Sequence, residues 1–321
     1  MKNNKHQWID IVKGIGILTI VIGHITDGIL REILFLFHVP LFFFLSGYLF
    51  KQPQELKSFI NKKTNALLIP YASFLMVFSS LLLLKEWLKT HEINIALITD
   101  ALWGGQALTG ELSVFWFITS LFLTQIVFAL IATVANKKVL SIIMLISLLL
   151  AYIAEPFMQD KSYFWAVNTV LYALPFYYAG YLYKQFNTSV TSIINHFCIV
   201  YTVLFFIAFS LMPEIFYIDI KYSNLGMPII SFVLSLTVTV VIFIVAQKTS
   251  DMSHLAKPFV MLGGMSMTIM YLHQPLQITV KHGFNLDNQF FLILLTILFS
   301  IFCHYMLSRT RLSRQYFFGG K

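Results

Sequence analysis

The stretch KGIGILTIVIGH, Lys13 to His24, begins with a cation, ends with an imidazole and is almost wholly aliphatic between them. It belongs to an apolar run near residues 10–27, and runs of about 18 to 22 residues recur along the chain, each long enough to cross the ~30 Å hydrocarbon core of a bilayer. The 321 residues are 58% hydrophobic and 11% charged, against roughly 25% charged in soluble domains. That composition leaves too little polar surface to cover a soluble core. We therefore predict an all-α polytopic membrane protein.

About ten transmembrane helices are expected. They lie near residues 10–27, 33–50, 65–84, 113–135, 139–155, 164–183, 192–212, 227–247, 258–281 and 289–307. The segments between them suggest no appended soluble domain, so residues 1–321 are predicted to form a single transmembrane domain.

The basic residues predict the orientation of the chain. With the N-terminus in the cytoplasm, the inner segments carry 15 of the 22 lysines and arginines, the outer segments carry 6, and Lys13 lies within a span. This bias follows the positive-inside rule and predicts that both termini are cytoplasmic. The net charge of +8 then indicates contact with anionic membrane lipid and not with nucleic acid, because the basic residues are scattered over separate segments.

Lys13 and His24 are candidate functional residues because an ionisable group within a span costs at least ~2.5–3.5 kcal/mol. His24 lies eleven positions after Lys13. In a helix this is three turns and about 20°, so both side chains lie on one face, ~16 Å apart along the axis. Gly14, Gly16 and Gly23 would let a neighbouring helix or a ligand approach closely. A simpler reading has Lys13 reaching to the inner interface and His24 only hydrogen-bonding between helices.

Two further histidines are expected at a similar depth. His38 lies some five residues inside the outer end of the span near 33–50, and His273 lies ~15 residues, or ~22 Å, along the span near 258–281. Pro275 is predicted to break that helix just after His273. The sequence leaves open whether the three imidazoles face one another.

Other polar and aromatic residues accompany these spans. Glu111 and Trp116 are expected near the mouth of an outer cavity, and Ser266 and Tyr271 precede His273. The outer segment 85–112 is mildly amphipathic and is predicted to include an interfacial helix.

Four sequence blocks together resemble the acyltransferase-3 family of membrane acyltransferases, especially its bacterial sugar O-acetyltransferase branch. They are IDIVKGIGILTIVIGH (9–24), FHVPLFFFLSGYLF (37–50), VFWF (114–117) and GGMSMTIMYLHQPL (263–276). A basic residue, ten intervening residues and a histidine form the first-helix motif of that family, matched here by Lys13 and His24. Many members have arginine at the first position, and lysine loses the bidentate contact that arginine makes with phosphate.

The resemblance implies about ten helices and transfer of an acyl group from cytoplasmic acyl-CoA to an acceptor at the outer face, commonly a surface carbohydrate or a lipid-linked sugar. Acetyl-CoA is then the expected donor, no metal is expected, and the expected location is the bacterial plasma membrane. Lys13 would contact a CoA phosphate, and Asp10 would neutralise Lys13 when CoA is absent or cap the helix start. His24 would be a general base or a nucleophile.

The remaining candidates take supporting roles under the same resemblance. His38 and His273 would orient His24, hydrogen-bond the acceptor or stabilise the developing oxyanion. Glu111, Trp116, Tyr271 and Ser266 are the expected substrate-binding residues. A homo-oligomer is compatible with the sequence.

Two other hypotheses remain open. Buried histidines in a polytopic protein also suit a proton-coupled exporter of polysaccharide or lipid-linked sugar, although no internal repeat is apparent. Three imidazoles and a water would also suit catalytic zinc, which His24, His38 and His273 would bind.

Overall fold

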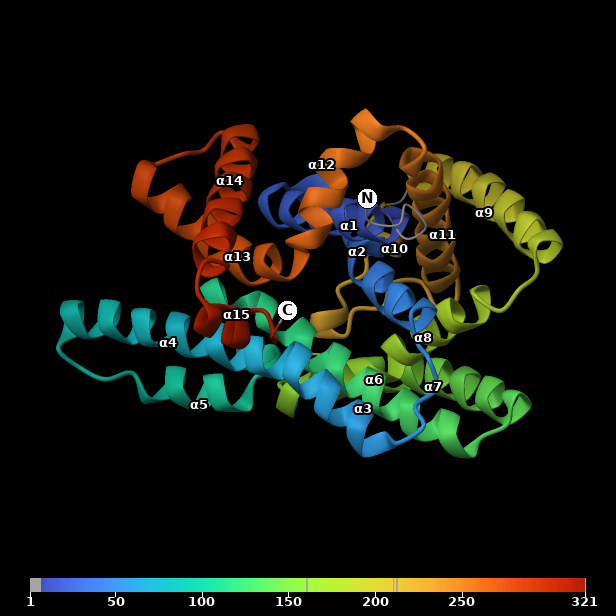
Figure 1. The fold of residues 1–321 in the computed structure, drawn as a ribbon, viewed down its shortest axis with the longest axis horizontal. Coiled ribbons are helices and arrows are strands. Elements are labelled where there is room, and N and C mark those ends of the chain that lie inside the picture. The colour runs from blue at the N-terminus through green and yellow to red at the C-terminus, as the bar shows by residue number, and fades with distance from the viewer. Residues whose placement is uncertain (1–6, 160, 210, 212, 321) are drawn as a thin grey trace. The chain divides into compact units, whose positions relative to one another are not determined.

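The computed structural model of the chain describes residues 7–159, 161–209, 211 and 213–320. Helices account for most of the described residues (Figure 1). Among the described residues, β-pairing is confined to an isolated bridge between Asp219 and Asn224. The predicted all-α class is confirmed.

Eight helical segments in the described part of the chain are long and apolar enough to cross a membrane. These are Gln7–Ile25 (α1), Gly28–Tyr48 (α2), Leu56–Thr90, Gly110–Val134, Lys137–Met158 (α7), Thr188–Ile207, Ile230–Ser250 (α11) and Gln289–Leu307 (α14). Leu56–Thr90 comprises α3 (Leu56–Lys63), a π-helical turn (Thr64–Leu68) and α4 (Ile69–Thr90), and Gly110–Val134 ends with α6 (Trp116–Val134). Thr188–Ile207 lies within α9 (Thr188–Phe209). Each matches one of the predicted runs, and the protein is an integral membrane protein.

The other two predicted spans are divided. The run near 164–183 is a 3₁₀ segment, Phe164–Thr169, followed by α8 (Val170–Tyr183), which has 14 residues. Trp165 and Ala166 have φ of 54° and 56°, which ends helical geometry there. An α-helix of this length is shorter than the ~20 residues that a span needs.

The run near 258–281 is also two helices, α12 (Ser253–Gly264) and α13 (Ser266–Phe284). The first ends at the Gly263–Gly264 pair, whose residues have low helix propensity. If the bent pair counts as one span, the described chain has up to nine. Pro275 lies inside α13, so the prediction that it breaks the helix is wrong. The depth expected for His273 assumed an unbroken helix and does not follow from this structure.

The contacts divide the chain into two compact units. The first lies within residues 1–51, 141–157 and 171–266, and includes α1, α2, most of α7, α8, α9, the turn α10 (Pro213–Phe216), α11 and α12. The second lies within residues 52–140, 158–170 and 267–321. It includes α3, α4, α5 (Ile95–Trp103), α6, α13, α14 and α15 (Arg311–Phe317).

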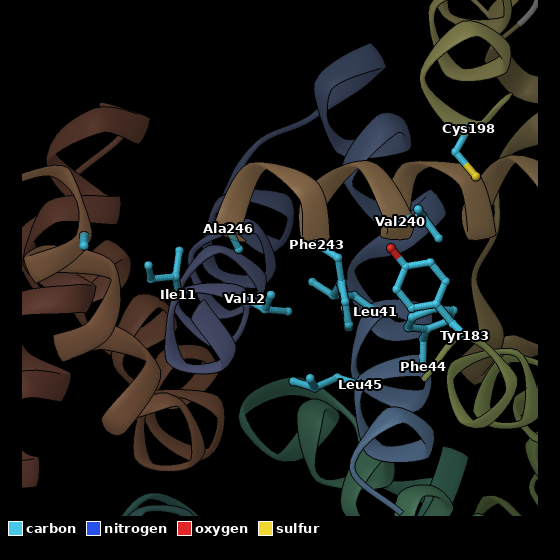
Figure 2. Close-up of a cluster of buried hydrophobic side chains, with 11 residues drawn as sticks. Ile11, Val12, Leu41, Phe44, Leu45, Tyr183, Cys198, Val240, Phe243 and Ala246 are labelled. Atoms are coloured by element: carbon cyan, nitrogen blue, oxygen red, sulfur yellow. The ribbon is translucent and has the colours of Figure 1, made fainter. Parts of the chain in front are cut away.

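The first unit is centred on a cluster of buried side chains at the meeting of α1, α2 and α11 (Figure 2). Phe243 of α11 is fully buried and packs edge-on to Phe44 of α2, with ring centroids 5.0 Å apart. The cluster comprises Ile11, Val12, Leu41, Phe44, Leu45, Tyr183, Cys198, Val240, Phe243, Ala246 and Ala256. Lipid is as apolar as these side chains, so close packing rather than escape from water holds such helices together.

Glycines bring the backbones of this unit close together. A Cβ at Gly14 of α1 would meet the carbonyl of Phe259 on α12, and a Cβ at Gly263 of α12 would meet the carbonyl of Asp10 on α1. The expected close approach at Gly14 is therefore confirmed. Gly47 of α2 packs in the same way on the carbonyl of Tyr177 in α8.

The second unit has a core of aromatic rings. Tyr271 of α13 is fully buried, stacks on Phe74 of α4 at 4.6 Å and contacts Phe115 at 5.1 Å. Phe317 of α15 packs edge-on to Phe74 at 4.8 Å, so the C-terminal helix joins the same core.

Candidate active site

Lys13 and Asp10 form an ion pair one turn apart on α1. Lys13 Nζ lies 2.9 Å from Asp10 Oδ1, and both side chains are partly exposed. The pair lies where α1 crosses α12, because Gly263 packs on the carbonyl of Asp10 and Gly14 packs on α12. The close crossing restrains the α1 backbone next to the pair. The Lys13 ammonium group is already balanced by the Asp10 carboxylate.

His24 lies one residue before the end of α1 and faces α2. Its ring centroid is 5.4 Å from that of Phe35 and 6.1 Å from that of His38, with the two imidazoles nearly perpendicular. The connection between the helices is short, and Gly28, with φ of 66°, begins α2. The α1–α2 hairpin thus brings together two of the three histidines predicted at similar depth.

His38 is almost fully buried, and its hydrogen bond fixes its tautomer. His38 Nδ1 lies 2.7 Å from the carbonyl oxygen of Leu34. A carbonyl only accepts, so Nδ1 carries the proton and donates it. In the neutral ring Nε2 is then an acceptor, which suits a residue that receives a hydrogen bond from a catalytic partner.

The loop that contains Tyr217, Asp219 and Lys221 packs against this hairpin, and the sequence did not predict that contact. The Tyr217 ring stacks on Phe35, with centroids 5.9 Å apart. The Arg31 guanidinium lies over the Phe35 ring, 4.9 Å from its centroid. Tyr217 also donates a hydrogen bond to Asp219 Oδ2 at 3.4 Å. Phe35 therefore connects His24 to a polar group made of Arg31, Tyr217 and Asp219.

The loop also places the buried Lys221 and the half-buried Asp219 close enough to interact electrostatically. Lys221 is 4% exposed. Burial lowers the pKa of Lys221 to about 8, although Asp219 opposes the shift. Burial raises the pKa of Asp219, while Lys221 and Arg31 oppose that shift. Burial, with Asp219 beside it, raises the pKa of the Tyr217 phenol to about 12.

Backbone bonds hold the charged pair in place. Asp219 and Asn224 exchange two backbone hydrogen bonds at 2.8 and 3.0 Å, and Glu155 of α7 accepts one from Leu225 N at 2.9 Å. The sequence did contain a signal for this pair of charges, because Asp219 and Lys221 alternate with apolar and aromatic residues in FYIDIKY (216–222).

His273 and Tyr271 belong to the second unit, on α13. His273 is fully buried, and its Nδ1 donates to the Ile269 carbonyl at 3.0 Å, by the same argument as for His38. The Tyr271 hydroxyl donates to the carbonyl of Leu67 at 3.4 Å. Ser266 is the first residue of α13 and is half-buried. That His273 shares a site with His24, and that Tyr271 and Ser266 bind substrate, remain predictions.

Glu111 and Trp116 differ in their surroundings. Glu111 pairs with Lys85 of α4 at 3.6 Å and lines a cavity of about 450 Å³ in the second unit. Trp116 is buried at the start of α6, with its ring against that of Phe117. Their predicted roles in substrate binding are untested by this geometry.

The described residues include no group of three or more His, Cys, Asp or Glu side chains positioned to hold a metal ion. The zinc hypothesis for His24, His38 and His273 therefore gains no support from the described part of the chain.

Comparison with known proteins gives one match. A family model described as an acyltransferase domain, that of the acyltransferase-3 family, matches residues 6–309. No curated protein and no solved structure matches the chain.

Proposed function

Since the chain belongs to the acyltransferase-3 family over nearly its whole length, we propose that it transfers an acetyl group from cytoplasmic acetyl-CoA to a hydroxyl group of a carbohydrate outside the bacterial plasma membrane. That it is an integral membrane acyltransferase follows from the family and from its apolar helices. The donor, the acceptor and the location are the proposal. The observation that carries it is the family match, with Lys13 and His24 at the spacing of the family motif.

In this proposal Lys13 receives the donor. A phosphate of CoA replaces the Asp10 carboxylate as its partner, so Asp10 keeps the cation balanced between turnovers. The helical rise from Lys13 to His24 is ~16 Å, of the same order as an extended pantetheine arm. A thioester held in this way reaches the imidazole from the inner side.

His24 acts as the general base. Its imidazole takes the proton of the acceptor hydroxyl as that oxygen attacks the thioester carbonyl, the carbon–sulfur bond breaks, and the CoA thiolate recovers the proton from His24. The products are the ester and free CoA. The acyl-imidazole route, with His24 as nucleophile, is the second mechanism.

Arg31 and Tyr217 orient the acceptor in this proposal. Both contact Phe35 of α2, which itself contacts His24, and the proposal takes this end of the hairpin to face outward. A guanidinium and a phenol beside an aromatic ring offer hydrogen bonds and an apolar face, a combination that suits a sugar ring. His38 supports His24 through its acceptor nitrogen.

The test is acyl transfer by purified protein in nanodiscs. Acetyl-CoA labelled in the acetyl group is supplied with the surface polysaccharide of the producing cell, freed of esters by mild base. We expect label in the polysaccharide and free CoA in equal amounts. His24→Ala should abolish both while leaving the melting temperature unchanged, and normal transfer by that variant contradicts the mechanism. Passage of polysaccharide across the membrane without CoA release supports the exporter hypothesis.

Lys13→Ala tests the donor site separately. Loss of a charge-assisted contact with phosphate should raise the KM for acetyl-CoA about tenfold or more and leave the KM for polysaccharide unchanged. Lys13→Arg keeps the cation and should retain most of the affinity. An unchanged KM in Lys13→Ala removes this residue from the donor site.

A further inference from the structure

A cavity of about 450 Å³, lined by both apolar and charged side chains, lies entirely within the second unit. Its walls are the last turns of α4, the middle of α5 and residues 107–112, and Figure 1 shows α4 and α5 as neighbouring helices joined by a loop. The volume falls within the roughly 300–1,000 Å³ range of small-molecule sites. The proposed reaction at Lys13 and His24 uses none of these walls.

Charged groups of both signs line the cavity. The lining residues are Leu82, Lys85, Glu86, Lys89, Thr90, Leu97, Asp100, Ala107, Leu108, Thr109, Gly110, Glu111 and Leu112. Carboxylates outnumber ammonium groups, which disfavours a polyanion such as a nucleotide. An acyl chain would strip water from these charges without replacing its hydrogen bonds. The acidic groups here are not positioned as a metal site within the described residues.

A polyhydroxylated ligand fits both signs of charge. Each sugar hydroxyl donates to a carboxylate and accepts from an ammonium group, and such charge-assisted hydrogen bonds are roughly twice as strong as neutral ones. Leucines 97, 108 and 112 supply an apolar wall for the C–H face of a sugar ring. Lys89 and Asp100 come from different helices, α4 and α5, and bring a donor and an acceptor to the same cavity.

The walls are held rigid. Asn94 caps α5 by accepting from Leu97 N at 3.1 Å, and its amide donates to both carboxylate oxygens of Glu86 at 3.1 and 2.9 Å. Buried Gln106, next to the cavity wall, donates to Asn168 at 2.8 Å. Gly110, with φ of 53°, makes the turn that places Glu111 opposite Lys85. A site with walls already ordered loses less conformational entropy when a ligand binds.

We propose that this cavity binds a segment of an oligosaccharide chain, so that the enzyme prefers a polymeric acceptor to a free monosaccharide. The inference rests on the proposed function only in taking the acceptor to be a carbohydrate.

The test is direct binding without acetyl-CoA. The probe is a set of fluorescently labelled oligosaccharides, from one to eight units, prepared by partial hydrolysis of the ester-free surface polysaccharide of the producing cell. Binding to full-length protein in nanodiscs is followed by anisotropy. The cavity variant is Lys89→Gln with Asp100→Asn. The control is Glu92→Gln with Lys161→Gln, which removes one charge of each sign at exposed positions of the same unit that do not line the cavity.

Affinity should rise with chain length in the unmodified protein. The cavity variant should bind the longer oligosaccharides at least tenfold more weakly, as expected for loss of hydrogen bonds to charged groups, whereas the control should change less than twofold. Equal affinity of the cavity variant and the control, or no binding by the unmodified protein, overturns the inference. If the cavity variant keeps its oligosaccharide affinity and still transfers acetyl groups, the cavity inference is overturned and the proposed reaction stands. Oligosaccharide binding at the cavity without transfer supports it and contradicts the proposed reaction.

Discussion

At the scale of the residue, the two neighbouring histidines of the α1–α2 hairpin have different chemical constraints. The Nδ1 proton of His38 is committed to the Leu34 carbonyl, so a neutral His38 can only accept at Nε2. It is therefore suited to orienting His24 and poorly suited to donating a hydrogen bond to an oxyanion. The sequence predicted a role for His38 but left these alternatives open, because the tautomer depends on a contact within the folded helix.

His38→Leu should lower kcat about a hundredfold, as expected for loss of the hydrogen-bond acceptor that orients a general base, with the KM for acetyl-CoA unchanged. A lower kcat with an unchanged KM for acetyl-CoA separates an orienting role from a loss of donor binding. His196→Leu is the matched control, because His196 on α9 also bonds to the carbonyl four residues earlier but is exposed. An unchanged kcat in the His38 variant would show that His38 is only structural.

The burial of Lys221 predicts how the stability of the fold depends on pH. The folded pKa of Lys221, about 8, lies below the ordinary 10.5, so the folded state binds fewer protons than the unfolded state between these values. Stability from this group should therefore rise as pH rises from about 8 to 10.5. The melting temperature of Lys221→Met, measured over the same range, should lack this component.

The same variant removes one of the two cations that stabilise the Asp219 carboxylate, and Arg31 remains. Lys221 offsets part of the cost of burying the Asp219 carboxylate, so Lys221→Met should melt lower than the unmodified protein at pH 7. The folded pKa of Asp219 is raised, so the carboxylate takes up a proton more readily in the folded state and the deficit should shrink as pH falls. Adding Asp219→Asn should recover stability at pH 7. A deficit that is constant from pH 5 to 7 contradicts this account.

At the scale of the element, α1 and α12 meet through glycines. Gly263→Leu should push α12 away from α1, because its side chain would meet the Asp10 carbonyl, and overpacking of this kind costs about 1–3 kcal/mol. The melting temperature should fall and the KM for acetyl-CoA should rise, since Asp10 and Lys13 lie at the crossing. Gly264→Ala is the control, because a Cβ there meets nothing within 4 Å. Equal effects of the two substitutions contradict a close crossing.

Long apolar runs were the part of the fold that the sequence predicted well. Eight of the expected spans are present, and the glycine contacts of α1 follow from KGIG alone. The breaks at Met265 and at Trp165–Ala166 were missed, because average hydropathy does not register a glycine pair or left-handed residues. The contact of Tyr217 with Phe35 was missed for a different reason: it joins segments far apart in the chain, and no local pattern encodes it.

At the scale of the whole molecule, the distribution of lysine and arginine predicts sidedness. Single cysteines at Glu92 and Lys161 should react with a membrane-impermeant maleimide added to intact spheroplasts, and one at Ser313 should react only after lysis. Glu92 and Lys161 are exposed, and Ser313 is partly exposed. The native Cys198 and Cys303, buried and half-buried, provide the background that the parent protein measures. Labelling in the opposite pattern reverses the predicted orientation and with it the direction of acyl transfer.

The glycine crossing of α1 with α12 also has a consequence for biosynthesis. Gly14 and its partner face at Phe259 are separated by roughly 250 residues of chain, which a ribosome makes in about 12–50 s at 5–20 residues per second. The first helix therefore enters the bilayer long before its partner exists, with a groove of small residues turned toward lipid or toward the insertion machinery. During that interval the nascent chain can pair with other helices through this groove, and only synthesis of α12 removes the opportunity.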